Sequence, residues 1–217
     1  MDKDNQANQS SKSTTTDVEH VPLHLRIGSF TTGGYPQRHY RLLSGRYDET
    51  GSPWLEWPEE MKEQHHEARS ILNDGDCMLI LIGPRGTGKT QLATELALDL
   101  DSRHCSEGKP LSHMYSTLSE LFNSEKASWK DPGASSPLER SKQVGLLVLA
   151  EIQEGVASDW EKQALTLLID DRYRNMKRTI MIGNLTKDGL GEFFSKSISS
   201  RVKETGLILE MAGKRYR

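Results

Sequence analysis

The sequence predicts an α/β fold in which a mainly parallel sheet is flanked by helices on both faces. Two apolar runs, Cys77–Ile82 and Val144–Ala150, have the length of strands that are buried on both sides. Segments with helical periodicity alternate with these and other short apolar runs from about residue 58 onward. This alternation is typical of parallel sheets, because each return to the starting edge needs a connection long enough for a helix.

The expected elements follow one another in a regular order. The first helix should start at Pro58 or Glu59, since proline is favoured in a first turn, and end near Leu72. Residues 73–76 (NDGD) should then turn the chain. The other expected elements are strand Cys77–Ile82, helix Lys89–His104, strand Leu111–Tyr115, helix Leu118–Ala127, loop Trp129–Ser141, strand Val144–Ala150, helix Asp159–Arg174, strand Arg178–Gly183 and strand Leu207–Glu210.

The N-terminal quarter differs from the rest in composition. Residues 1–20 contain almost no apolar side chains and cannot offset the entropy of ordering, so we expect a disordered polar tail. Residues 21–57 mix Gly, Pro and aromatic residues without clear periodicity and are expected to form a short lead-in segment. Residues 58–217 are then long enough for one α/β domain with its own core.

Bulk composition excludes several classes of protein. No apolar run approaches the roughly 20 residues that a membrane helix needs, and we expect no signal peptide and no membrane partner. Cys77 and Cys105 are the only cysteines and form no C-x-x-C pair. They are expected to be two reduced thiols in a cytoplasmic protein, without a structural zinc site. His65 and His66 are expected to be solvated on the first helix.

A glycine-rich segment between a strand and a helix carries the clearest chemistry. Residues 83–90 read GPRGTGKT and match the P-loop pattern G-x-x-x-x-G-K-[ST]. Its glycines let backbone N–H groups turn toward phosphate oxygens, and the following helix N-terminus favours an anion. We expect ATP here, with Lys89 at the β/γ-phosphates and Thr90 as a Mg²⁺ ligand, rather than a glycine-rich turn without a ligand. The expected nucleotide-binding residues are Gly83, Pro84, Arg85, Gly86, Thr87, Gly88, Lys89, Thr90 and Gln91.

The ends of two later strands carry polar residues that belong to the same chemistry. In P-loop NTPases a later apolar strand ends in an Asp that helps to hold Mg²⁺. Here the strand ends in Ala150, which offers no oxygen, and an acidic residue follows as Glu151. Asn184 follows another predicted strand. Its amide can orient an attacking water, and the alternative is an Asn that only turns the chain.

Charge is unevenly distributed although the net charge of the chain is only −3. From Arg172 to Arg217 there are eleven Lys or Arg against four Asp or Glu. A basic C-terminal quarter indicates a nucleic-acid or phosphate partner, and the alternative is a solvated face with a few arginines that contact the nucleotide.

Taken in order, several segments resemble the DnaC/IstB-like AAA+ ATPases, which include helicase loaders and the ATP-dependent helper proteins of some transposons. The similar segments together span most of residues 34–217. They are Gly34–His39 (GYPQRH), the P-loop, residues 146–154 (LLVLAEIQE), residues 159–185 (DWEKQALTLLIDDRYRNMKRTIMIGNL), Ile198–Arg201 (ISSR) and Gly213–Arg217 (GKRYR).

The resemblance implies a role for single residues. Residues 58–217 would form an AAA+ ATPase domain with Asn184 as sensor 1. Arg201 would be an arginine finger that completes the ATP site of a neighbouring subunit, which implies a ring or a helical filament. Without the resemblance, Arg201 reads as an exposed helix arginine. Arg217 would be a sensor-2-like arginine at the γ-phosphate. The expected catalytic residues are Glu151, Asn184 and Arg201.

Two departures from the family pattern shape the functional hypotheses. Ala150 stands where the family has Asp, so Mg²⁺-dependent ATP hydrolysis is expected to be slow. The segment before the ATPase core is short for a helicase-binding domain.

The leading hypothesis is an ATP-controlled assembly factor that oligomerises on DNA and recruits a replicative helicase or a transposase. One alternative is an ATP-binding adaptor with little or no turnover. The other is a small-molecule kinase, which the absence of an arginine-rich lid segment disfavours.

Overall fold

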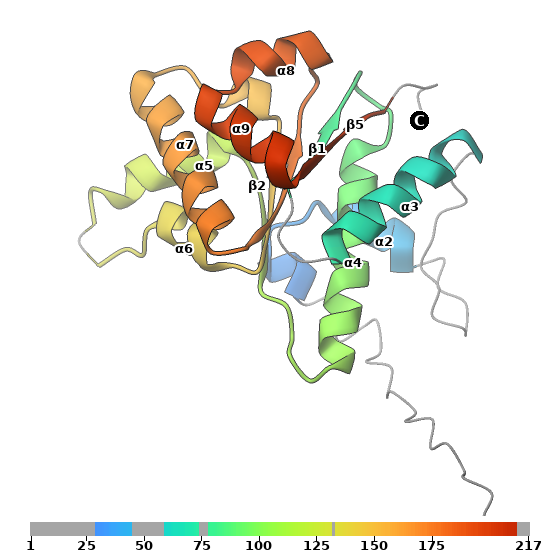
Figure 1. Cartoon of the computed structure of the whole chain (residues 1–217). Coiled ribbons are helices and arrows are strands. Elements are labelled where there is room, and N and C mark those ends of the chain that lie inside the picture. Colours follow the sequence, from blue (N-terminus) through green and yellow to red (C-terminus); the bar gives the residue numbers. More distant parts are fainter. Residues whose placement is uncertain (1–28, 45–58, 74–77, 132, 212–217) are drawn as a thin grey trace, which may run out of the picture.

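The protein is built around one five-stranded parallel sheet between two layers of helices (Figure 1). This computed structural model describes residues 29–44, 59–73, 78–131 and 133–211. The strands are β1 (Met78–Ile82), β2 (His113–Thr117), β3 (Leu146–Ala150), β4 (Arg178–Ile182) and β5 (Gly206–Glu210). Their spatial order is β2-β3-β4-β1-β5, and every neighbouring pair is parallel. The predicted α/β fold class is confirmed.

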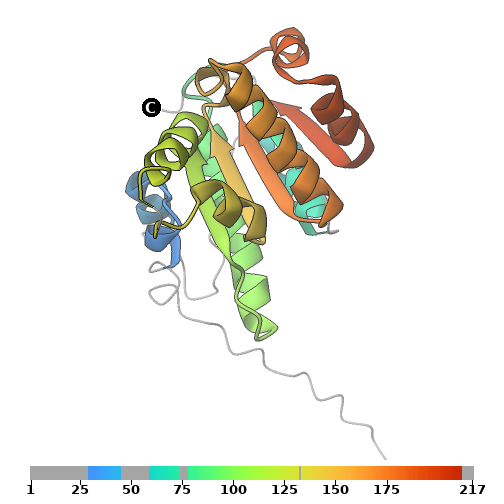
Figure 2. The ribbon, with the colours of Figure 1, turned by 90° about the vertical axis from the view of Figure 1, so that its left-hand side faces the viewer.

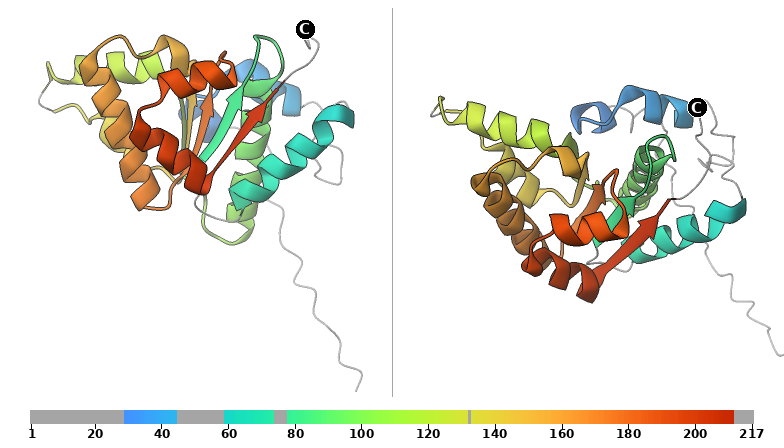
Figure 3. Two further views of the ribbon diagram at one scale, coloured as in Figure 1. Left: turned by 45° about the horizontal axis from the view of Figure 1, so that its top comes forward. Right: turned by 90° about the horizontal axis from the view of Figure 1, so that it is seen from above.

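Helices cover both faces of the sheet, which explains why β1 and β3 are apolar along their whole length. Every residue of β1 and of β3 is buried. On one face lie α2 (Gln37–Ser44), α3 (Glu59–Asn73) and α4 (Lys89–Ser106). On the other face lie α5 (Leu118–Ser128), α6 (Pro137–Gln143), α7 (Asp159–Arg174), α8 (Lys187–Phe193) and α9 (Lys196–Thr205), as the rotated views show (Figures 2 and 3). Among the helices of the described ranges, none is both long and apolar enough to cross a membrane.

The described part of the lead-in segment, residues 29–44, packs into the same core as the strands. Phe30, Tyr35 and Tyr40 are almost fully buried in the cluster that α3 and α4 form with the sheet. Within residues 21–57, where the sequence showed no clear periodicity, the structure forms the helix α2. Gly34 turns the chain at a φ of 84°, and a Cβ there would lie 2.6 Å from the carbonyl oxygen of Tyr115. A glycine at this position therefore lets the lead-in lie directly against β2.

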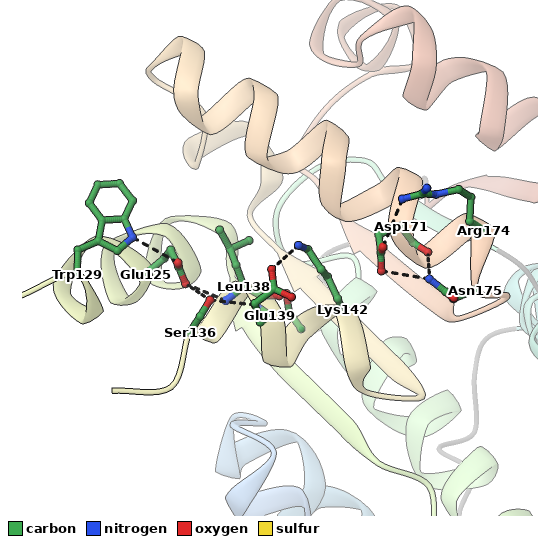
Figure 4. Close-up of polar contacts among 10 residues, drawn as sticks. Glu125, Trp129, Ser136, Leu138, Glu139, Lys142, Asp171, Arg174 and Asn175 are labelled. Atoms are coloured by element: carbon green, nitrogen blue, oxygen red, sulfur yellow. Dashed lines mark hydrogen bonds and ion pairs between the residues drawn. The ribbon is translucent and has the colours of Figure 1, made fainter. Parts of the chain in front are cut away.

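The last part of the loop expected at Trp129–Ser141 is helical instead, because the short helix α6 begins at Pro137 and ends at Gln143. Ser136 caps its first turn, proline occupies a first-turn position, and the Glu125 carboxylate of α5 accepts hydrogen bonds from the Leu138 N–H at 3.0 Å and the Ser136 hydroxyl at 2.7 Å (Figure 4). Burial alone would raise the pKa of Glu125, but these hydrogen bonds and one from Trp129 outweigh burial and lower it. A helix of two turns is stabilised by such contacts, which periodicity does not show.

One histidine of the first helix is not solvated as expected. The His65 ring lies 3.4 Å from the Glu95 carboxylate, and the two side chains are 12% and 0% exposed. His66, in contrast, is exposed. The contact joins α3 to α4 on one face of the sheet.

Arg172 of α7 is a buried structural cation at the amino edge of the sheet. Its side chain is 1% exposed. The guanidinium donates to the Ser141 carbonyl at 2.6 Å, the Val144 carbonyl at 2.9 Å and the Thr179 hydroxyl at 2.9 Å, and also to the Arg178 carbonyl. It thereby joins the end of α6 to the segments that enter β3 and β4. These acceptors would be buried without a donor if the arginine were removed.

We expect Arg172→Met to lower the free energy of unfolding by about 3 kcal/mol or more, because it leaves several buried acceptors without a hydrogen-bond donor. Arg174→Met on the same helix is the control, since the Arg174 side chain is 71% exposed. The control should change stability by less than about 0.5 kcal/mol. Urea unfolding of both variants measures the difference, and equal stability would show that the Arg172 contacts contribute nothing net.

Candidate functional site

The P-loop joins the carboxyl end of β1 to the start of α4. Gly83, Gly86 and Gly88 have φ values of 126°, 87° and 91°, a region that L-residues with side chains rarely adopt. Gly88 is the N-cap of α4 and provides no side-chain hydrogen bond to the first turn. Because a helix start has N–H groups without intrahelical acceptors, this end of α4 can donate to an anion.

Gly83 lies where three strand ends meet. Its N–H donates to the Leu185 carbonyl at 3.1 Å, which ties the P-loop to the segment that follows β4. A Cβ at position 83 would lie 2.5 Å from the carbonyl oxygen of Met211, the residue after β5. The Met211 N–H donates in turn to the Ile82 carbonyl at 2.8 Å. Only glycine permits this approach without moving the backbone.

Lys89 is the charged group at the centre of the loop. Its side-chain nitrogen donates to the carbonyls of Gly83 at 2.8 Å and Pro84 at 2.6 Å. The residue is 5% exposed, and burial lowers the pKa of its ammonium to about 8. Thr87 donates from its hydroxyl to the same Pro84 carbonyl at 3.1 Å. The ammonium is thus held by the carbonyls of the loop itself.

Thr90, the expected Mg²⁺ ligand, has a neighbour that the motif does not predict. The Tyr115 phenol of β2 is near enough that the Thr90 side chain acts to lower the pKa of the phenol. Burial raises the pKa of Tyr115 to about 12, and the carboxylates of Glu151 and Glu120 add to the rise. The phenol therefore carries its proton at neutral pH, beside the first turn of α4.

The end of β3 combines a missing carboxylate with a strained backbone. Ala150 is 2% exposed and belongs to the core cluster under α4. The exposed Glu151 has a φ of 52°, the left-handed region, and starts the short 3-10 helix η1 (Ile152–Glu154). A non-glycine residue in this region costs about 1 kcal/mol or more, and such residues cluster at functional sites.

A polar chain connects Asn184 with the P-loop. The Asn184 backbone N–H donates to the Gln153 side-chain oxygen at 3.0 Å, and the Gln153 amide donates to the Glu154 carboxylate at 3.2 Å. Glu154 pairs with Arg85 of the P-loop at 2.6 Å. Asn184 is thereby positioned on the same side of the sheet edge as the loop. The motifs did not identify Gln153, and its only signal in the sequence is its place two residues after Glu151.

The Gln91 side chain, expected to contact the nucleotide, lies between α2 and α4. Its oxygen is 2.9 Å from the His39 ring nitrogen, and its amide nitrogen donates to the Glu95 carboxylate at 3.2 Å. Burial lowers the pKa of His39, and the hydrogen bond to the Gln91 side-chain oxygen opposes that effect. Because the Gln91 side chain is hydrogen-bonded elsewhere, the expected contact of residue 91 with a nucleotide would have to come from its backbone N–H, in the first turn of α4.

Arg201 lies on α9, on the opposite face of the sheet from α4. Its guanidinium is 3.5 Å from the Asp170 carboxylate and stacks over the Tyr173 ring at 4.7 Å. Ser197 donates to the same carboxylate at 3.0 Å. The structure does not bring Arg201 to the P-loop of its own chain. Arg217 lies outside the described residues.

Comparison with known proteins places this geometry among nucleotide-binding proteins. The family described as IstB-like ATP binding protein matches residues 69–202. A search among curated proteins found no match. The solved structure of the DnaC helicase loader is similar at a TM-score of 0.61 and 19% identity, covering 82% of this chain and 100% of that one. The crystal structure of DnaI is similar at a TM-score of 0.60 and 20% identity, covering 84% of this chain and 94% of that one.

Replication initiators share the fold over part of their length. Domain III of the Thermotoga maritima replication initiation protein DnaA is similar at a TM-score of 0.60 and 19% identity, covering 73% of this chain and 65% of that one. The chain covers only 47% of a DNA replication initiation factor and 51% of DnaA from Aquifex aeolicus. At these identities the likeness establishes the fold.

Proposed function

The chain belongs to the IstB-like ATP-binding protein family, and we propose that it is an ATP-dependent, DNA-binding assembly factor that forms nucleotide-controlled oligomers and recruits a partner enzyme. The observation that carries the proposal is the P-loop itself. Its buried ammonium, Lys89, and the uncapped start of α4 face the same loop. This arrangement fits the phosphates of a nucleotide.

The P-loop geometry supports ATP with Mg²⁺ as the ligand. Phosphate oxygens would replace the carbonyls of Gly83 and Pro84 as acceptors of the Lys89 ammonium, at better electrostatic energy because they are charged. Thr90 would hold the metal ion. Glu151 and Asn184 are the residues at the neighbouring strand ends that we assign to the attacking water.

Two observations support the assembly role: the similarity of the fold to solved replication proteins, and the basic charge of the C-terminal quarter. The similar proteins include the DnaC helicase loader, and one similar DnaA structure is bound to AMPPCP and single-stranded DNA. The C-terminal quarter of this chain is basic. We propose that the partner is a replicative helicase or a transposase. We also propose that the ATP-bound form assembles as a ring or a helical filament on DNA.

A second function is favoured by one observation. Ala150 is buried at the end of β3 and offers no oxygen to Mg²⁺. An ATP-binding adaptor with little or no hydrolysis would need only the P-loop. Phosphate release in the presence of DNA separates the two functions, because the adaptor binds ATP without measurable turnover.

Lys89→Ala should lower ATP affinity by at least about 100-fold, since it removes a charge-assisted contact to the phosphates. Lys109→Ala is the control, because Lys109 is exposed after α4. Isothermal titration calorimetry compares both variants with the wild type. Equal affinity of wild type and Lys89→Ala would remove the basis of the proposed nucleotide site.

Ala150→Asp should raise ATP turnover about tenfold or more, because a carboxylate would then fix Mg²⁺ where charge develops. Ala150→Asn is the control, because asparagine has the shape of aspartate without its charge, and it should raise turnover less. Phosphate release is measured at saturating ATP and DNA. If neither variant turns over faster than the wild type, slow hydrolysis does not come from position 150.

DNA binding should be salt-sensitive and largely independent of sequence, because phosphate neutralisation releases counterions. Log affinity should fall linearly with log salt concentration in a fluorescence anisotropy titration with ATP present. An affinity that stays flat between low and physiological salt would contradict a phosphate-driven contact, as would the lack of any binding.

Arg201→Ala should leave ATP binding to the isolated subunit nearly intact and remove ATP-induced assembly. If the arginine completes a neighbour's ATP site, nucleotide and oligomer stabilise each other by the same coupling energy. Lys203→Ala on the same helix is the control, since Lys203 is exposed. Light scattering with ATP and DNA measures assembly. Normal assembly of Arg201→Ala would show that the subunit interface lies elsewhere.

A further inference from the structure

The turn after β3 folds back onto the end of β4. Glu151 leaves the strand in the left-handed region at a φ of 52°, and the short helix η1 follows at once. Ile152 of this helix is fully buried, and a Cβ at Gly183 would lie 3.1 Å from its Cγ1 atom. The glycine before Asn184 therefore lets η1 pack closely against the residues that follow β4.

Three consecutive residues after β4 are held through their backbone. The Gly183 N–H donates to a carbonyl of β1 at 2.9 Å, and the Leu185 carbonyl accepts from the N–H of Gly83 at 3.1 Å. Between them, the Asn184 N–H donates to the Gln153 side-chain oxygen at 3.0 Å. Of these three hydrogen bonds, only the one at Asn184 uses a side chain. Its acceptor can therefore be removed by a point mutation at Gln153.

The Gln153 amide is oriented from both ends. A backbone N–H can only donate, and an ionised carboxylate can only accept. The Asn184 N–H therefore fixes the Gln153 oxygen, and the Glu154 carboxylate, 3.2 Å away, fixes the Gln153 nitrogen. Glu154 in turn pairs with Arg85 at 2.6 Å, and its carbonyl accepts from the Ser119 hydroxyl at 3.0 Å. The amide is thus held between the P-loop, the first turn of α5 and the residue after β4.

We propose that Gln153 is a positioning residue, whose side-chain oxygen fixes the Asn184 backbone so that the Asn184 amide meets the γ-phosphate end of the nucleotide. Because the Asn184 N–H is already bonded, its side-chain amide is the donor that remains for the phosphate or the attacking water. An amide both donates and accepts, so it can contact either. This inference rests on the proposed function, since it deepens the assignment of Asn184 to the attacking water.

The expected consequence is a preference for ATP over ADP rather than a higher affinity for both. Lys89 and the start of α4 would bind phosphates that the two nucleotides share. The Asn184 amide would contact only the γ-phosphate end. Loss of the Gln153 oxygen should therefore weaken the binding of a triphosphate and leave the binding of a diphosphate intact.

The test measures the ratio of AMPPCP affinity to ADP affinity by isothermal titration calorimetry, on the full chain with excess Mg²⁺. Gln153→Met keeps the length of the side chain and removes its acceptor. It should lower the ratio about fivefold with ADP affinity unchanged, because a hydrogen bond at the γ-phosphate end is lost. In the Asn184→Ala background the same change should alter the ratio less than about twofold. That background keeps the N–H that Gln153 binds and lacks the amide, so a purely structural effect of Gln153 would persist there.

Two further variants serve as controls. Gln143→Met makes the same substitution at an exposed glutamine before β3, at the amino edge of the sheet, and should leave the ratio unchanged. Gln153→Glu combined with Glu154→Gln exchanges the two side chains. The carboxylate at position 153 can then accept from both the Asn184 N–H and the amide at position 154, so this double variant should keep the ratio within about twofold of the wild type.

The inference is overturned if Gln153→Met leaves the ratio unchanged, if the loss is as large in the Asn184→Ala background, or if the exchanged pair loses the preference as well. It is also overturned if Asn184→Ala itself keeps the wild-type ratio. A wild-type chain that binds neither AMPPCP nor ADP would overturn the proposed function too, whereas wild-type binding of both confines the failure to the inference about Gln153.

Discussion

The close contact of three backbone segments at Gly83 is the constraint on which the site depends. The P-loop, the segment after β4 and the residue after β5 meet there, through the hydrogen bond to Leu185 and the approach to the Met211 carbonyl. Because the strands are parallel, all their carboxyl ends reach this edge. The glycine lets the edge close tightly there, at the edge where we propose that Lys89, Thr90 and Asn184 serve one nucleotide site, although two of them are about ninety residues from the third.

Two buried cations among the described residues lie at opposite edges of the sheet. Arg172 at the amino edge is surrounded by fixed acceptors that belong to the turns between elements. Lys89 at the carboxyl edge is held by two carbonyls of a single glycine-rich loop. A cation that joins several elements stabilises the fold, whereas one held by its own loop can exchange its acceptors for phosphate at small structural cost. We regard this difference as the physical reason that the first is structural and the second serves the proposed nucleotide site.

Much of the fold could be predicted because β1 and β3 are buried on two faces and are uninterrupted apolar runs in the sequence. The bounds of α7 follow from Ser158 at its start, where a capping box forms with Glu161. The edge strand β2 lies two residues later than predicted, since its half-buried residues give no clear pattern. The P-loop residues follow from the motif. Tyr115 and Gln153 do not, because their contacts depend on strand register and on the turn after β3.

The central claim is that the edge formed by β1, β3 and β4 binds Mg²⁺-ATP through the P-loop. A crystal structure with Mg²⁺ and a non-hydrolysable ATP analogue tests it most directly. The account predicts that the Lys89 ammonium leaves the Gly83 and Pro84 carbonyls for phosphate oxygens, and that the Thr90 hydroxyl ligates the metal ion. An analogue bound away from the P-loop, or a bound analogue with Lys89 still held by those carbonyls, would contradict it.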